Sequence, residues 1–105
     1  MPHRRIVQAF LAELDSAVSN IGKVTKEEMA ILLKRSAATI KEYRDEIDFS
    51  RVNASDAGWR DVVFELREMA KMIQLFSPAE VAVKLLYAGA IIRSASFLVN
   101  ETHRG

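Results

Sequence analysis

The chain has 105 residues, half of them hydrophobic, with four glycines, two prolines and no cysteine. A chain this apolar and this poor in turn residues is neither disordered nor a many-stranded β protein, and its length suits one domain. The formal charge of +1 gives no bulk attraction for nucleic acid or a membrane surface, and the lack of cysteine excludes disulfides and thiolate chemistry. Composition therefore predicts a compact helical protein, and with the four helices described below we expect a single all-α domain over residues 1–105, arranged like a four-helix bundle.

The first predicted helix covers residues 5–21. Its apolar side chains recur at every third or fourth position, which is the spacing of one helix face. They are Ile6, Val7, Phe10, Leu11, Leu14, Ala17, Val18 and Ile21. Gly22 follows at the place of a left-handed residue that ends a helix. We expect a one-sided helix that covers a core.

The second predicted helix covers residues 26–47 and begins at a capping box formed by Thr25 and Glu28. Its stripe of apolar or small residues is Met29, Leu32, Leu33, Ser36, Ile40, Tyr43 and Ile47. Residues 49–58 then lose the helical period and gather Ser, Asn, Asp and Gly, which indicates a loop. Phe49 and Val52 in this loop are apolar, so we expect the loop to fold back onto the bundle.

The third predicted helix covers residues 56–76, with Ser55 or Asp56 as its cap. Its stripe is the most regular in the chain and consists of Trp59, Val62, Val63, Leu66, Met69, Ala70, Ile73 and Phe76. The helix ends directly before the next helix begins, which predicts a sharp corner between the two. We see no internal repeat in the sequence.

The fourth predicted helix covers residues 78–100, and Ser77, Pro78 and Glu80 give it a complete start signal. It carries two apolar strips: Val81, Leu85, Ala88, Ile92 and Val99 form the first, and Val83, Leu86, Ala90 and Phe97 form the second. A column of small residues, Ala82, Gly89 and Ser96, runs beside them and predicts the close approach of another backbone. This helix is therefore expected to be central or to form half of an oligomer interface.

Two charges interrupt the fourth helix. Lys84 and Arg93 leave only residues 85–92 free of charge, whereas a membrane span needs about 18–20 apolar residues. The amphipathic N-terminal stretch does not have the pattern of a signal peptide. We therefore expect no membrane contact and a cytoplasmic protein.

The stretch from Thr25 to Ile47 resembles the helix-turn-helix of bacterial and phage regulators. Met29 and Ala30 match its apolar-then-alanine pair, Ser36 matches the residue that opens the recognition helix, and Thr39 with Ile40 matches the pair that anchors that helix. The resemblance implies a DNA-binding regulator. Its base and phosphate contacts would come from Ala38, Lys34, Arg35, Thr39, Lys41 and Arg44.

A continuous helix explains the same residues without a turn. The usual glycine of the turn is Lys34, the apolar residue after it is Arg35, and the apolar stripe passes through Ser36 without a change of phase. Residues 37–48 also carry two basic against four acidic side chains, which disfavours a helix facing phosphates. We therefore prefer a continuous helix from 26 to 47 and keep DNA binding as the alternative.

Few residues suggest catalysis. The two histidines, His3 and His103, lie at the ends of the chain, and no glycine-rich phosphate loop or Ser, His, Asp set is present. We predict no enzyme, no metal site and no cofactor. The expected function is a small cytoplasmic interaction or regulatory module that presents helix faces to a protein partner, as a homodimer.

Overall fold

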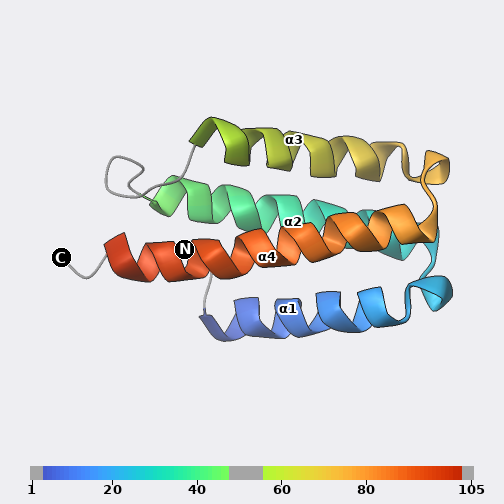
Figure 1. The fold of residues 1–105 in the computed structure, drawn as a ribbon, viewed down its shortest axis with the longest axis horizontal. Coiled ribbons are helices and arrows are strands. Elements are labelled where there is room, and N and C mark those ends of the chain that lie inside the picture. The colour runs from blue at the N-terminus through green and yellow to red at the C-terminus, as the bar shows by residue number, and fades with distance from the viewer. Residues whose placement is uncertain (1–3, 48–55, 103–105) are drawn as a thin grey trace.

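The computed structural model describes residues 4–47 and 56–102, and the described residues form four α-helices and two short 3-10 helices (Figure 1). The elements in order are α1 (Arg4–Ser19), η1 (Ile21–Lys23), α2 (Lys26–Glu46), α3 (Asp56–Lys71), η2 (Ile73–Leu75) and α4 (Pro78–Thr102). The predicted all-α architecture of four packed helices is confirmed. Phe49 and Val52, the cap at Ser55, and both histidines lie outside the described residues.

Both predicted helix starts are present, with the caps at Thr25 and Ser77. The backbone N–H of Glu28 donates to Thr25 Oγ1 over 3.1 Å, and that of Glu80 donates to Ser77 Oγ over 3.2 Å. In return the Ser77 N–H donates to Glu80 Oε1 over 2.9 Å. Pro78 is the first residue of α4, where its missing N–H leaves no helical hydrogen bond unmade.

The ends of α1 and α3 differ from the sequence prediction. Each α-helix stops two residues before a 3-10 turn, so the first helix ends at Ser19 and not at Ile21, and the third ends at Lys71 and not at Phe76. Ile73 in η2 is buried and Ile21 in η1 is half-buried. Because these turns keep an apolar side chain on the core, the helical period continues through them and hides the change of helix type.

Gly22 does not end a helix in the left-handed conformation. It lies inside η1 with its φ outside the left-handed region, and the chain turns through hydrogen bonds from Lys23 N to Asn20 O and from Val24 N to Ile21 O. The C-cap expected at Gly22 is therefore wrong. The second turn has the same geometry, and it makes the predicted sharp corner between the third and fourth helices within residues 72–77.

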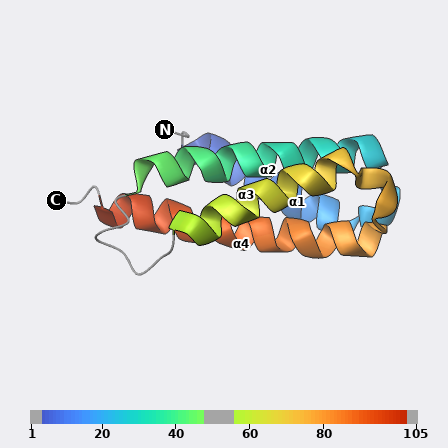
Figure 2. The same ribbon diagram turned by 90° about the horizontal axis from the view of Figure 1, so that it is seen from above.

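The helices α2 and α4 form the centre of the bundle, with α3 on one side and α1 on the other (Figures 1 and 2). α2 packs against α3 and α4, and α4 packs against α1. Their contact faces supply most of the core, which includes Leu33, Ile40, Leu85, Ile92 and Val99. Trp59 is half-buried against this core.

The two halves of the chain have the same order of secondary-structure elements, which was not predicted from the sequence. Each half consists of a helix, a 3-10 turn, a capping box and a second helix, and both turns lie at the same end of the bundle (Figure 1). Thr25 and Ser77, the two caps, are 52 positions apart. Few residues are identical at this spacing, so no repeat is evident in the letters alone.

The pattern that repeats between the two halves is the position of the buried residues. The buried positions of α2 and its C-cap are Met29, Leu33, Ser36, Ala37, Ile40, Tyr43 and Ile47. The positions 52 residues later are Val81, Leu85, Ala88, Gly89, Ile92, Ala95 and Val99, and all seven are buried too. α2 and α4 therefore present equivalent inner faces, and equivalent outer faces, to their surroundings.

Candidate interaction surface

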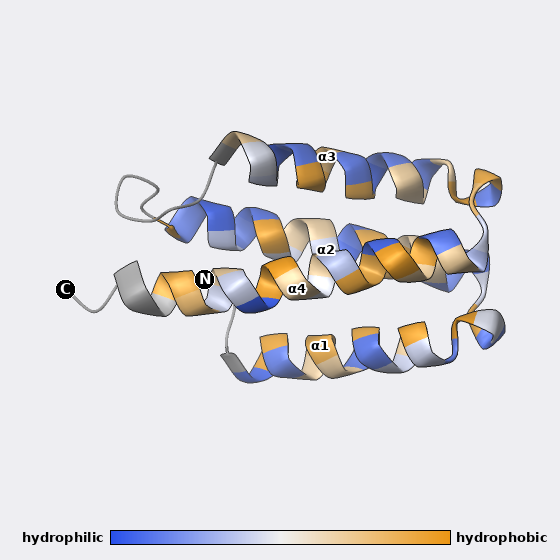
Figure 3. Cartoon of the chain, viewed as in Figure 1, coloured by the Kyte–Doolittle hydropathy of each residue, from blue (hydrophilic) through white to orange (hydrophobic). Residues whose placement is uncertain are grey.

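The outer face of α4 is apolar and exposed. The first apolar strip of this helix is buried, whereas the second faces solvent: Val83 is 67% exposed, Leu86 52% and Phe97 64%. Tyr87 joins this strip with half of its surface exposed. We define the α4 outer face by seven exposed residues on one side of the helix, which are Ala79, Val83, Leu86, Tyr87, Ala90, Ser94 and Phe97. Pro78, Glu80 and Arg93 are exposed too and lie beside this face. Figure 3 shows hydrophobic segments along α4 on the side that faces the viewer.

The two basic residues of α4, Lys84 and Arg93, lie at the borders of this face and are directed toward neighbouring helices. Lys84 Nζ lies 2.9 Å from Glu65 Oε2 on α3, and Arg93 Nη2 lies 2.9 Å from Asp15 Oδ2 on α1. Arg93, Asp15 and Glu65 are about half exposed and Lys84 is 23% exposed, so each pair remains in contact with solvent and contributes about 1 kcal/mol or less to stability. Their position matters more than their energy, because the strip between them carries no charge.

This apolar character gives α4 a second property. Over Pro78–Val99 it has the length and mean hydropathy of a membrane-spanning helix, a property that core helices of soluble proteins share. Lys84 and Arg93 are too few charges to exclude a membrane-spanning helix by composition.

The outer face of α2 provides an internal comparison. The positions equivalent to the α4 outer face are Glu27, Ile31, Lys34, Arg35, Ala38, Glu42 and Asp45, and all seven are exposed. Five of these seven are charged, whereas none of the seven on α4 is charged. The outer face of α2 is therefore charged although α2 occupies the position in the first half that α4 occupies in the second. Folding alone does not require the outer face of α4 to be apolar.

The predicted column of small residues, Ala82, Gly89 and Ser96, is not part of the α4 outer face. Gly89 is buried against α1, where a Cβ atom would lie 3.9 Å from Leu14 and 4.0 Å from Leu11. Ser96 borders a shallow depression of about 430 Å³ beside α1, and Ala82 is half-buried. The close approach that Ala82, Gly89 and Ser96 suggested is thus made within one chain, at least at Gly89. The face available to a partner is the second apolar strip.

The residues of the DNA-binding alternative lie on one uninterrupted helix. α2 runs as a single α-helix through Lys34, Arg35 and Ser36, so the turn that a helix-turn-helix needs is absent there. The hydroxyl of Ser36 donates to the Leu32 carbonyl oxygen over 2.8 Å, and that of Thr39 donates to the Arg35 carbonyl oxygen. The continuous helix is confirmed, and the helix-turn-helix geometry is wrong.

Basic residues of that alternative have acidic neighbours. Arg35 Nη1 lies 2.8 Å from Glu13 Oε2 and its guanidinium stacks 4.4 Å from the centre of the Phe10 ring. Lys41 Nζ lies 3.7 Å from Asp45 Oδ2, and Arg44 is half-buried. The exposed surface of α2 is therefore of mixed charge, which does not favour a phosphate backbone.

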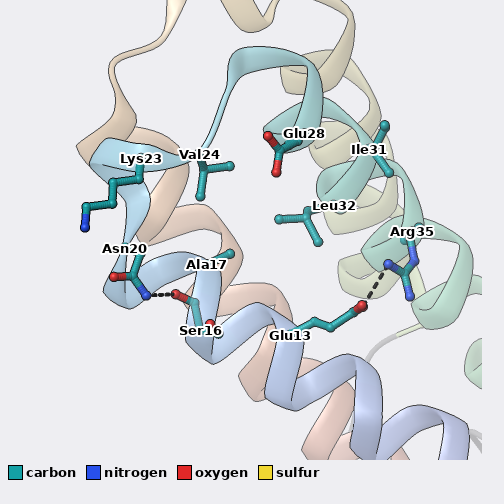
Figure 4. Close-up of a pocket in the computed structure, with 10 residues that line it drawn as sticks. All are labelled: Glu13, Ser16, Ala17, Asn20, Lys23, Val24, Glu28, Ile31, Leu32 and Arg35. Atoms are coloured by element: carbon teal, nitrogen blue, oxygen red, sulfur yellow. Dashed lines mark hydrogen bonds and ion pairs between the residues drawn. The ribbon is translucent and has the colours of Figure 1, made fainter.

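A groove of about 510 Å³ separates α1 from α2 near η1 (Figure 4). Its lining is Glu13, Ser16, Ala17, Asn20, Lys23, Val24, Glu28, Ile31, Leu32 and Arg35. The Glu13–Arg35 ion pair crosses one end, and Asn20 Nδ2 donates to the Ser16 carbonyl oxygen at the other (Figure 4). At the positions equivalent to Ala17 and Val24 the second half of the chain has the bulkier Met69 and Phe76. The groove therefore reflects missing side-chain volume in the first half.

The described residues contain no group of three His, Asp or Glu side chains that could hold a metal ion. Every buried side-chain nitrogen or oxygen that the structure describes has a hydrogen-bond partner. The second strip predicted from the sequence is part of the α4 outer face, whereas Ala79, Tyr87 and Ser94 of that face were not predicted. Comparison with protein-family models, curated proteins and solved structures gave no match to this chain.

Proposed function

We propose that this chain is a non-catalytic helical interaction module that acts as a homodimer through the α4 outer face. The observation that carries the proposal is the contrast between the two equivalent outer faces, charged on α2 and uncharged on α4. A continuous apolar strip of this kind on a small protein typically marks an interaction site. We keep the expectation that the module acts in the cytoplasm.

The energetics of the exposed strip support association. Moving a large apolar side chain from full exposure to full burial is favourable by about 1.5–3 kcal/mol, and Leu86 and Phe97, which are 52% and 64% exposed, can still gain somewhat more than half of this. A folded monomer leaves Val83, Leu86, Tyr87 and Phe97 in water, so a partner surface that covers them gains this free energy. The bordering charges on Lys84 and Arg93 already have counter-charges within the chain, so covering the strip isolates no unpaired charge.

The size of the molecule also suits a dimer. The broad side that Figure 1 shows has edges of 44 and 26 Å, and α4 runs along it. A standard interface buries about 800 Å² on each partner, which such a side can provide.

The test uses a variant that gives α4 the residues of α2. In Leu86→Lys with Phe97→Asp, two outer-face positions receive the side chains that Lys34 and Asp45 supply at the equivalent places. The wild-type chain is expected to have twice the mass of one 11.8 kDa chain in light scattering at micromolar concentration. The double variant is expected to be monomeric, with a dissociation constant at least about 30-fold higher, because a lost apolar anchor costs about 2 kcal/mol.

The matched control is Phe64→Asp. Phe64 on α3 is 62% exposed, close to the 64% of Phe97 on the outer face. It lies on a different side of α3 from Glu65, the residue that contacts α4. This variant should remain a dimer. A wild-type chain that is monomeric at all concentrations would overturn the homodimer, and binding of that monomer to phospholipid vesicles through α4 would assign the face to a membrane surface instead.

A further inference from the structure

The α4 outer face has a pattern that fits a second copy of itself in one orientation. Resting on the homodimer proposed above, we infer that two copies pair through antiparallel α4 helices, with Ala90 of both copies at the two-fold axis. The residues that carry this inference are the bulky side chains at equal distances from Ala90 and the small ones that complement them.

The spacing about Ala90 is symmetric. Val83 lies seven residues before it and Phe97 seven residues after it, so all three project from nearly the same side of α4. Leu86 lies four residues before Ala90 and Ser94 four residues after it. All five of these residues are exposed.

An antiparallel pair that crosses at Ala90 places complementary volumes opposite each other. Leu86 faces Ser94 of the second copy, and Val83 faces Phe97 of the second copy. Large side chains facing small ones interdigitate and keep the separation of the two helices even. With alanine at the crossing point, the two backbones can approach closely there.

A parallel pair lacks this complementarity. Each residue near the centre of the face then meets its own copy, so Leu86 faces Leu86 of the second copy, while Ala90 and Ser94 face small partners and leave a gap. Such uneven packing costs contact where the helices are held apart. The parallel pair also brings like ends of two long helices together, whereas the antiparallel pair aligns opposite ends of their dipoles.

Site-directed cross-linking tests the orientation, and the chain suits it because it contains no cysteine. Single cysteines at exposed positions, Val83→Cys and Phe97→Cys, are treated with a bis-maleimide, separately and as an equal mixture, after light scattering shows that each variant keeps the wild-type mass. The expected result is a covalent dimer in the mixture, with at least a fivefold lower yield in either variant alone.

Two further variants locate the axis. Ala90→Cys is expected to cross-link to itself, whereas Ala38→Cys, the equivalent exposed alanine on α2, is expected not to. Cross-linking of Val83→Cys alone and of Phe97→Cys alone would show a parallel dimer and overturn the inference while the proposed homodimer stands. A dimer mass without cross-links at 83, 90 or 97 would remove α4 as the interface, and a monomer mass would remove both proposals.

Discussion

Lys26, the first residue of α2, donates a hydrogen bond from Nζ to the carbonyl oxygen of Phe76, the residue that follows η2. The same Nζ atom lies 3.3 Å from the carbonyl oxygen of Ile73. One side chain of the first half thus satisfies two backbone acceptors of the turn in the second half. The equivalent position in the second half is Pro78, which has no such donor.

Replacing this lysine should weaken the fold. Lys26→Met keeps the length of the side chain but removes the charged donor, and hydrogen bonds to charged groups are worth about 1.5–3 kcal/mol when well shielded. Because the contact is only partly buried, we expect the free energy of unfolding to fall by about 1–2 kcal/mol. Urea unfolding measures the change. Lys41→Met, which removes an exposed lysine from the same helix, should change stability by less than about 0.5 kcal/mol.

Gly89→Ala should stabilise the protein. Glycine within a helix is less favourable than alanine by roughly 0.5–1 kcal/mol, and Gly89 has helical neighbours on both sides. The new Cβ would lie 3.5 Å from Arg93 Nη1 and 3.9 Å from Leu14 Cδ1, which are ordinary contact distances. We expect the free energy of unfolding to rise by about 0.5–1 kcal/mol in urea unfolding. A decrease would show that α1 leaves no room for the new Cβ. The control Ala38→Gly, on the exposed side of α2, should lower the free energy of unfolding by about 0.5–1 kcal/mol.

Filling the groove between α1 and α2 should also stabilise the protein. Val24→Phe gives the first half the side chain that Phe76 supplies in the second, beside the apolar Ala17 and Leu32. Substitutions that fill cavities commonly add about 0.5–2 kcal/mol, and we expect a gain near the lower end because the groove is open. Thermal unfolding measures the gain. The reference variant Val24→Ala should lower the melting temperature, and a lower melting temperature for the phenylalanine variant would show that the groove cannot accept the ring.

The capping box of α4 should make stability depend on pH in the acid range. The backbone N–H of Ser77 and its hydroxyl group hydrogen-bond the carboxylate and hold the pKa of Glu80 below its ordinary value of 4.5. Since the pKa is lower in the folded chain, Glu80 stabilises the fold above its unfolded pKa, and this stabilisation is lost as the pH falls through the folded pKa.

Glu80→Gln removes this group from the titration. We expect the free energy of unfolding of the variant to fall less steeply than that of the wild type between about pH 5 and pH 3. Urea unfolding at several pH values gives both curves. Equal slopes would mean that folding does not change the protonation of Glu80. The reference variant is Glu65→Gln on α3, which changes another glutamate to an amide and whose partner is the Lys84 side chain.

The starts of α2 and α4 could be predicted from the sequence because their signals are local. A capping residue and a glutamate three positions later satisfy N–H groups of the same helix turn, so nothing distant decides the outcome. The two apolar strips of α4 and the stripes of α2 and α3 follow from helical periodicity in the same way. The ends of α1 and α3 could not be predicted in this way, because Ile21 and Ile73 continue the apolar period through 3-10 turns.

The candidate surface depended on the tertiary structure. The sequence by itself determined that α4 carries two apolar strips, Val81 to Val99 and Val83 to Phe97, which its periodicity and hydropathy do not rank. Only the packing of α1 and α2 onto α4 decided that the first strip is covered and the second remains in water. The likeness of the two halves was hidden for the same reason. Burial repeats where residue identity does not, because a core position requires a small or apolar side chain of suitable volume and not a particular residue.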